Sequence, residues 1–165
     1  MPVVWFNILS KEIRNPQRIC ILGIGNIQKG DDGAGPMIVR ILKEKIKNPK
    51  AKDILFIDGG EVPENFTGEI RKFLPDLTII IDACISGKKP GIIYLVNPEK
   101  IELNDISTHR LPLSMFVKFL EETIPTKVLV IGIEPKNLNF GDGISPEVKK
   151  AVEALVWLLC ECLKI

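Results

Sequence analysis

Hydrophobic residues along the chain form short continuous runs that alternate with helical patterns. Five such runs, at residues 19–24, 54–57, 77–81, 91–96 and 128–133, predict strands. A continuous apolar run of this length indicates a strand covered on both faces, as in a parallel sheet. Between the runs, apolar residues recur at helical spacing, for example at Ile38, Ile41 and Leu42. The pattern predicts an α/β fold, a three-layer α/β/α sandwich with about five mostly parallel strands.

The connections between the runs refine this topology. Only a turn at residues 88–91 precedes the fourth run, so no crossover helix fits there and this strand should be antiparallel. If the first three strands lie in the order two, one, three, the first and third are neighbours. Ligands bind at the carboxyl ends of the strands where such an order reverses.

Length and composition indicate one globular domain over residues 1–165, with residues 1–18 as an N-terminal extension whose role cannot be read from the sequence. A hydrophobic content of 45% excludes a disordered chain, and a net charge of +1 offers no electrostatic reason for binding nucleic acid or an anionic membrane. No apolar run reaches the ~20 residues that span a bilayer. The N-terminus lacks the features of a signal peptide, so we expect a cytoplasmic protein. The four cysteines form no C-x-x-C pair and are expected to be reduced core residues.

The first run ends in a glycine-rich turn that also holds two adjacent acids, Asp31 and Asp32. A dinucleotide site is disfavoured because Gln28 replaces the third glycine of the fingerprint and two negative charges would repel a pyrophosphate. A P-loop is excluded because no Gly-Lys-Ser/Thr follows. The acids have two interpretations, both open: they cap the following helix, or one caps it while the other faces a cleft and meets a cation.

Acids also follow two other runs. Asp58 precedes two glycines, and the simplest interpretation is a residue that stabilises the turn. Asp82 follows the most apolar run, where a carboxylate is costly unless it is solvated, paired or bound to a cation. If the strand order is two, one, three, Asp32 and Asp82 face one crevice.

His109 is the only histidine in the chain, which excludes a zinc site with two or three histidines. The sequence also lacks the H-E-x-x-H and G-x-S-x-G motifs. Any hydrolysis must therefore use neither the common zinc arrangement nor the common serine arrangement.

Four short motifs together resemble the hydrogenase maturation proteases, the endopeptidases that trim the C-terminal extension of [NiFe]-hydrogenase large subunits. The motifs are Gly23-Ile24-Gly25-Asn26, residues 30–36 (GDDGAGP), Asp58-Gly59-Gly60 with Pro63-Glu64-Asn65, and Thr108-His109 with Pro112-Leu113. The resemblance extends over nearly all of the chain from Ile19 onward, with the same order of elements.

The resemblance implies that Asp32, Asp82 and His109 are the catalytic and metal-binding residues. Two carboxylates and one imidazole suit a borderline divalent ion such as nickel or zinc. The implied metal is nickel that the hydrogenase large-subunit precursor already holds, with no nucleotide cofactor. The implied partner is that precursor, and the implied oligomeric state is a monomer.

The residues leave the chemistry open. A metal that polarises a carbonyl or a water, and a carboxylate that activates a water, both fit the acids. A thiol route through Cys84 and His109 is a third possibility. Two other functions also remain: a nickel-sensing module that binds the precursor without cutting it, and a nucleotide-binding α/β domain.

Overall fold

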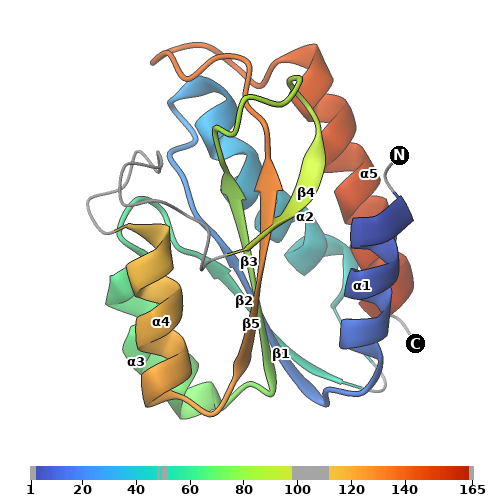
Figure 1. The fold of residues 1–165 in the computed structure, drawn as a ribbon, viewed down its shortest axis with the longest axis vertical. Helices are drawn as coiled ribbons and strands as arrows, with labels where there is room; N and C mark the ends of the chain where they lie inside the picture. The colour runs from blue at the N-terminus through green and yellow to red at the C-terminus, as the bar shows by residue number, and fades with distance from the viewer. Residues whose placement is uncertain (1–2, 48, 50–51, 98–111, 164–165) are drawn as a thin grey trace.

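The computed structural model describes residues 3–47, 49, 52–97 and 112–163, which fold into a sheet with helices on both faces (Figure 1). The strands are β1 (Arg18–Gly23), β2 (Asp53–Asp58), β3 (Leu77–Ala83), β4 (Ile93–Val96) and β5 (Lys127–Ile133). The α-helices are α1 (Val3–Arg14), α2 (Ala34–Lys45), α3 (Thr67–Phe73), α4 (Leu113–Thr123) and α5 (Pro146–Leu163). Two 3₁₀ turns, η1 (Gly30–Gly33) and η2 (Pro63–Phe66), precede α2 and α3.

The strand order is β2-β1-β3-β5-β4, with β4 antiparallel to β5 and every other pair parallel. The predicted α/β sandwich, the antiparallel fourth strand and the order two, one, three are therefore confirmed. β3 lies in the middle of the sheet and is buried along its whole length, as its apolar run predicted.

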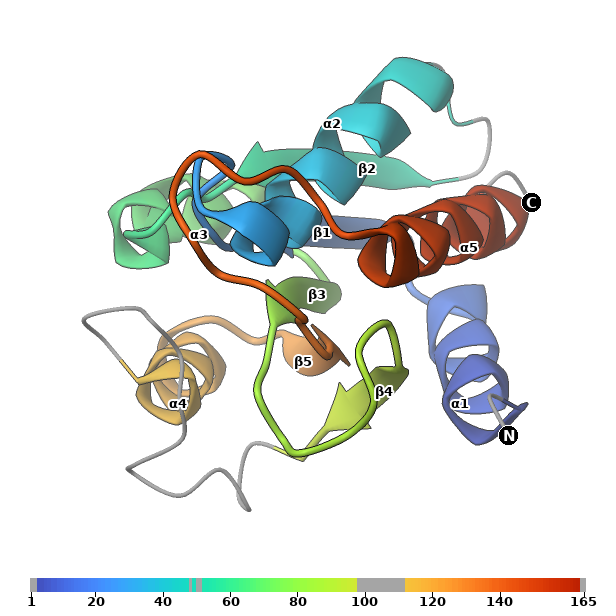
Figure 2. The same ribbon diagram turned by 90° about the horizontal axis from the view of Figure 1, so that it is seen from above.

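Two apolar clusters hold the helices on opposite faces of the sheet. One joins the sheet to α1, α2 and α5, and includes Ile79, Ile38 and Leu155. The other joins it to α3 and α4 through Ile80 and Phe116. Figure 2 shows the three layers, with α3 and α4 on one side of the row of strands and α1, α2 and α5 on the other.

Some predicted boundaries were wrong. The first strand begins at Arg18 and ends at Gly23, one residue earlier at each end than the run at 19–24 predicted. The third strand continues through Ala83, so Asp82 lies within the strand and not after it. The fourth strand begins at Ile93 and not at residue 91, because the chain is still in a turn there, with Gly91 at a φ of 86°.

Residues 1–18, predicted only as an extension, contain the helix α1. Its Leu9 and Ile13 are buried in the same cluster as α5. Lys52 contacts the turn between α1 and β1. Its Nζ donates to the carbonyl oxygens of Arg14 at 2.9 Å and Pro16 at 2.6 Å. Burial lowers the pKa of Lys52.

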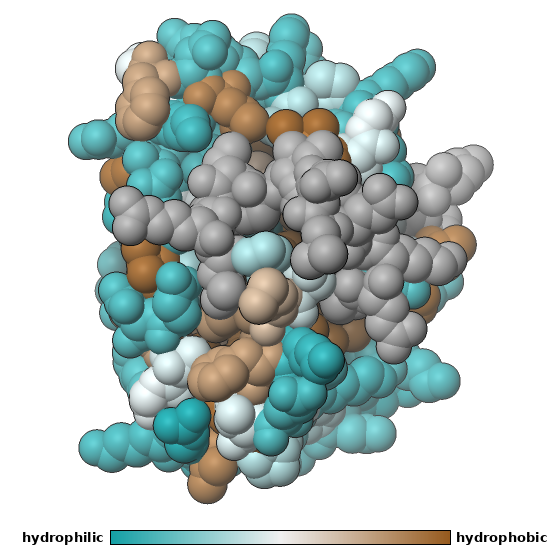
Figure 3. Space-filling view, turned by 60° about the vertical axis from the view of Figure 1, so that its left-hand side comes forward, coloured by the Kyte–Doolittle hydropathy of each residue, from teal (hydrophilic) through white to brown (hydrophobic). Residues whose placement is uncertain are grey.

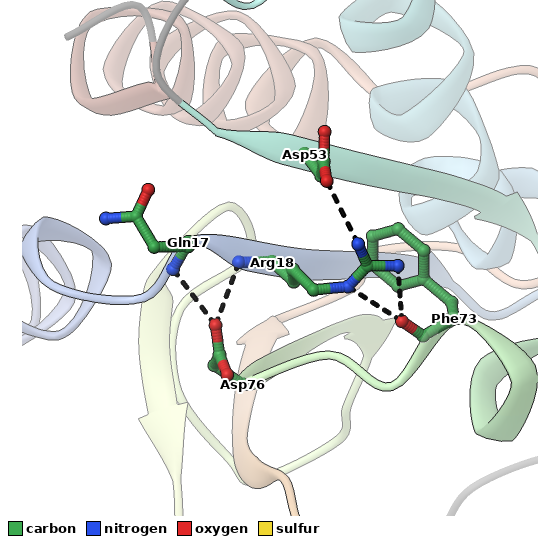
Figure 4. Close-up of polar contacts among 5 residues, drawn as sticks. All are labelled: Gln17, Arg18, Asp53, Phe73 and Asp76. Carbon is green, nitrogen blue, oxygen red and sulfur yellow. Dashed lines mark hydrogen bonds and ion pairs between the residues drawn. The ribbon is translucent and has the colours of Figure 1, made fainter.

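Polar contacts join the amino ends of the strands. The Asp76 carboxylate accepts the backbone N–H groups of Gln17 and Arg18, and the Arg18 guanidinium binds Asp53 and the carbonyl oxygen of Phe73 (Figure 4). These contacts set where β1 and β2 begin. The opposite edge of the sheet, where the parallel strands end, carries the predicted site. No described helix is long and apolar enough to cross a membrane.

Candidate active site

Asp82 is buried at the carboxyl end of the central strand, with no exposed surface. Asp82 lies two residues after Ile80 and four after Thr78 in the strand. Its side chain is therefore on the same sheet face as theirs, which α3 and α4 cover. In the sheet register it is opposite Gly132 of β5, which is in turn opposite Tyr94 of β4.

Tyr94 lies across Gly132 and closes the site on the β4 side. A Cβ atom at Gly132 would stand 2.8 Å from the Cζ atom of the Tyr94 ring, so only glycine leaves room for the ring. The Tyr94 hydroxyl donates to the carbonyl oxygen of Cys84 at 3.0 Å. Burial raises the pKa of Tyr94, and negative charge on neighbours that include Glu134 and Asp82 raises it further.

Asp32 lies in η1, after the loop that follows β1, and is 1% exposed. Its Oδ2 accepts the backbone N–H of Asn26 at 2.8 Å. Gly25 has a φ of 139°, and a Cβ there would overlap the carbonyl oxygen of Asp32. Glycine is therefore required for the chain after β1 to fold back against the acid.

The turn that carries Asp32 lies beside the strand that carries Asp82. Pairing between β1 and β3 continues past the strand end, with the Ile24 N–H donating to the Ile81 carbonyl oxygen at 2.9 Å, and η1 contacts β3. The two acids thus belong to neighbouring segments at the carboxyl edge of the sheet, as their positions in the sequence predicted.

The adjacent acid Asp31 has a different role from the one predicted. Neither acid is the N-cap of α2: the cap is Gly33, without a side-chain hydrogen bond. Instead, Asp31 reaches the segment after β5. It accepts the backbone N–H groups of Lys136, Asn137 and Ser145 at 2.7–3.0 Å and the Ser145 hydroxyl at 2.9 Å.

Asp58 has the turn-stabilising role predicted for it. Its carboxylate binds Arg40 of α2, with Nε at 2.8 Å and Nη2 at 2.6 Å, and accepts the N–H of Gly60 at 3.3 Å. These contacts stabilise the turn, and they give Asp58 a structural role with no evident part in catalysis.

Glu134 is a buried acid whose contacts the sequence did not reveal. It is 3% exposed, and its two oxygens accept the Ser86 backbone N–H at 3.0 and 2.9 Å, while the Ser86 hydroxyl donates at 3.2 Å. One signal was available: Glu134 directly follows an apolar run, as Asp82 follows another.

The prediction for His109 lies outside the described residues, since positions 98–111 are not among them. Among the residues that are described, no three histidine, cysteine, aspartate or glutamate side chains are arranged to hold a metal. All four cysteines are free, as expected, with Cys20 and Cys160 buried and Cys84 and Cys162 half-buried. Burial raises the pKa of the Cys20 thiol to about 12, which makes it unreactive.

The surface beside the site is mixed in character. Hydrophilic residues cover most of the face in Figure 3, and apolar residues appear between them in small areas. Exposed apolar side chains occur in the loops at the carboxyl edge of the sheet, at Ile27, Val62, Ile85 and Phe140. Scattered exposed residues of this kind are normal for a protein surface.

Comparisons with known proteins agree with this architecture. The sequence profile of HycI, hydrogenase maturation protease, matches residues 36–162. Hydrogenase 3 maturation protease of Escherichia coli is 36% identical over 136 residues, covering 82% of this chain and 84% of that protein. A crystal structure of a [NiFe] hydrogenase maturation protease HycI from Thermococcus kodakarensis has a TM-score of 0.87 and 34% identity, covering 96% of this chain and 99% of that one.

A solution structure of an endopeptidase HycI from Escherichia coli is also similar, with a TM-score of 0.72 and 31% identity over 86% of this chain and 87% of that one. The profile matches well over half of the chain, and the similarity to the Thermococcus structure extends over almost its full length. The chain belongs to the hydrogenase maturation protease family.

Proposed function

We propose that this protease removes the C-terminal extension of a [NiFe]-hydrogenase large-subunit precursor after nickel insertion. Asp32, Asp82 and His109 bind the nickel that the precursor carries, so that the enzyme cuts only a precursor that has received its metal. The similarity to maturation proteases of [NiFe] hydrogenases supports this assignment of substrate.

The burial of two carboxylates at one edge of the sheet carries the proposal. Asp32 and Asp82 are 1% and 0% exposed, on the turn after β1 and on the adjacent strand β3. Buried carboxylates are retained where they are hydrogen-bonded or meet a cation. Two carboxylates and an imidazole make a borderline donor set that suits nickel and leaves positions for ligands from the precursor.

Two routes to hydrolysis use these residues. When nickel is bound, it supplies Lewis-acid chemistry toward a carbonyl or a water. In the other route the carboxylate of Asp32 or Asp82 takes a proton from the attacking water. The third route, through the half-buried thiol of Cys84 together with His109, is a separate possibility that the Cys84→Ala variant tests.

Purified enzyme mixed with nickel-loaded precursor tests the proposal, with the precursor mass followed by mass spectrometry. We expect the wild type to shorten the nickel-loaded precursor and to leave nickel-free precursor intact. Asp32→Asn, Asp82→Asn and His109→Ala should each lower the rate by about 100-fold or more, the range of a lost catalytic group. Asp58→Asn is the matched control, since Asp58 serves a turn and not the site.

The outcomes separate the alternatives. Full processing by all three site variants would refute the residue assignment. A stable complex with a precursor of unchanged mass would indicate a binding module that does not cut. Cys84→Ala should process normally, and a loss of activity in that variant would support the thiol route.

A further inference from the structure

The sheet by itself does not determine where Asp32 lies. β3 holds Asp82 within its ladder, opposite Gly132. Asp32, in contrast, lies in η1 after a loop that leaves the sheet beyond Ile24, although η1 still contacts β3. A hydrogen bond from Asn26 reaches the Asp32 carboxylate, but Asn26 belongs to the same loop. The spacing between the two carboxylates therefore depends on contacts outside the sheet.

Many of those contacts come from residues 134–145, which join β5 to α5 and which we call the bracket. Asp31, directly before Asp32, accepts four hydrogen bonds from Lys136, Asn137 and Ser145 of the bracket. Backbone contacts reinforce them, since Asp31 N–H donates to the Asn137 carbonyl at 2.7 Å and Gly30 N–H to Asp142 at 3.2 Å. In Figure 1 the bracket, in orange, runs over the end of the sheet toward which β3 and β5 point.

The first residue of the bracket holds the chain on the other side of the site. Glu134 accepts the Ser86 N–H and hydroxyl, in the connection that follows Asp82 and Ala83. Its own backbone pairs with Gly91 and Ile92, at the far end of that connection. Glu134 thus ties both ends of the connection between β3 and β4 to the segment after β5.

We propose that Asp31 and Glu134 are positioning residues of the proteolytic site. Through the bracket they set the distance between the carboxylates of Asp32 in η1 and Asp82 in β3. Both positioning carboxylates are almost fully buried, at 0% and 3% exposed, and both accept hydrogen bonds from segments distant in the chain. The inference rests on the proposed function, because it assigns these residues to the geometry of the same site.

Residues that orient metal ligands commonly change metal affinity or activity by 10–100-fold when they are replaced. We expect Asp31→Asn and Glu134→Gln to lower kcat for nickel-loaded precursor by about 10–100-fold. KM should change by less, about two-fold, because the surface that meets the precursor is retained. Ser145→Ala and Ser86→Ala remove single hydroxyl donors, and each should lower kcat by about five-fold. These milder variants keep the test valid if a buried-acid variant fails to fold.

Two further measurements distinguish positioning from general destabilisation. Amide hydrogen exchange should rise at Lys136, Asn137 and Ser145 in Asp31→Asn, and at Ser86 in Glu134→Gln, with the rest of the sheet still protected. Titration of the isolated protein with NiCl₂ should show weaker binding in both variants, by about the same factor as kcat. Asp58→Asn, which changes a turn acid at the end of the edge strand β2, should alter none of these quantities.

Equal kcat in wild type, Asp31→Asn, Glu134→Gln and both serine variants would overturn the inference, as would a loss of activity that merely follows the folded fraction. Failure of the proposed function has a different signature: Asp32→Asn and Asp82→Asn would process precursor normally while exchange in the bracket still responded to Asp31→Asn.

Discussion

Two neighbouring acids, Asp31 and Asp32, have different tasks although their sequence context is almost the same. Asp31 accepts hydrogen bonds from a segment more than 100 residues away along the chain, whereas Asp32 accepts the N–H of the nearby Asn26. A carboxylate that accepts several hydrogen bonds within the protein is a structural element, because each bond to a charged group adds about 1.5–3 kcal/mol. The environment of each carboxylate, and not its residue type, therefore distinguishes a structural acid from one proposed to be catalytic.

Tyr94 gives the site region a spectroscopic probe, because it is the only tyrosine in the chain. Burial raises its pKa above the ordinary 10.0, so the folded state keeps the phenol proton where the unfolded chain begins to lose it. Its contribution to stability is complete below pH about 10 and is lost as the pH rises through the folded-state pKa. We therefore expect tyrosinate absorbance to appear well above pH 10 in folded protein and near pH 10 in denaturant.

Tyr94→Phe is the control for this titration. Above pH 10 the unfolding free energy of the wild type should fall more steeply than that of Tyr94→Phe, which cannot ionise at this position. Ionisation of folded protein near pH 10 would contradict the burial of the Tyr94 hydroxyl against Cys84.

At the scale of elements, α1 is part of the core and not an appendage. Its Leu9 is fully buried, and Lys52 donates to the carbonyl of Arg14, the last residue of the helix. A cation at a helix C-terminus satisfies orphan carbonyls and meets the negative end of the helix dipole. The similarity to the Thermococcus structure, which covers 96% of this chain, indicates that this helix is shared with at least one relative.

A matched pair of substitutions in α1 tests this integration. Leu9→Ala should lower the free energy of unfolding by about 2–4 kcal/mol, since it leaves a cavity in the cluster shared with α5. Ile8→Ala, at a neighbouring position that is 41% exposed, should change it by about 0.5 kcal/mol or less. Denaturant unfolding measures both, and equal effects would show that α1 does not share the core.

At the scale of the whole molecule, the sheet separates two apolar clusters but also belongs to both. Residues of β3 alternate between them, with Ile79 and Ile81 in one and Ile80 in the other. Loss of either cluster therefore exposes one face of β3, the strand whose other face packs in the remaining cluster. This arrangement predicts one cooperative unit and supports the interpretation of residues 1–165 as a single domain.

The two tryptophans report on this cooperativity, because Trp5 lies in α1 and Trp157 in α5. In Trp157→Phe, which alters a side chain that is 64% exposed, Trp5 becomes the sole tryptophan. Its fluorescence in denaturant should change at the same midpoint as the far-ultraviolet circular dichroism of the whole protein. An earlier fluorescence transition would show that α1 unfolds on its own.

Local patterns in the sequence predicted the fold class and the edge of the sheet at which Asp32 and Asp82 lie. Apolar runs predicted the strands, a short connection predicted the antiparallel one, and acids after two runs indicated Asp32 and Asp82 at one edge. These features are local: periodicity, connection length and the position of a polar residue at a strand end are all written in contiguous residues. The motifs that resemble the maturation proteases were likewise local, and the family is confirmed.

The hydrogen-bond partners of Asp31 and Glu134, in contrast, became apparent only in the folded chain. Asp31 and Ser145 are 114 positions apart, and Glu134 and Ser86 are 48 apart, so no local pattern connects them. The capping interpretation failed for the same reason, since it considered only the adjacent helix while the partners of Asp31 lie beyond β5. Hydrogen bonds between distant loops depend on how the sheet and its connections pack, which a sequence pattern of short range does not contain.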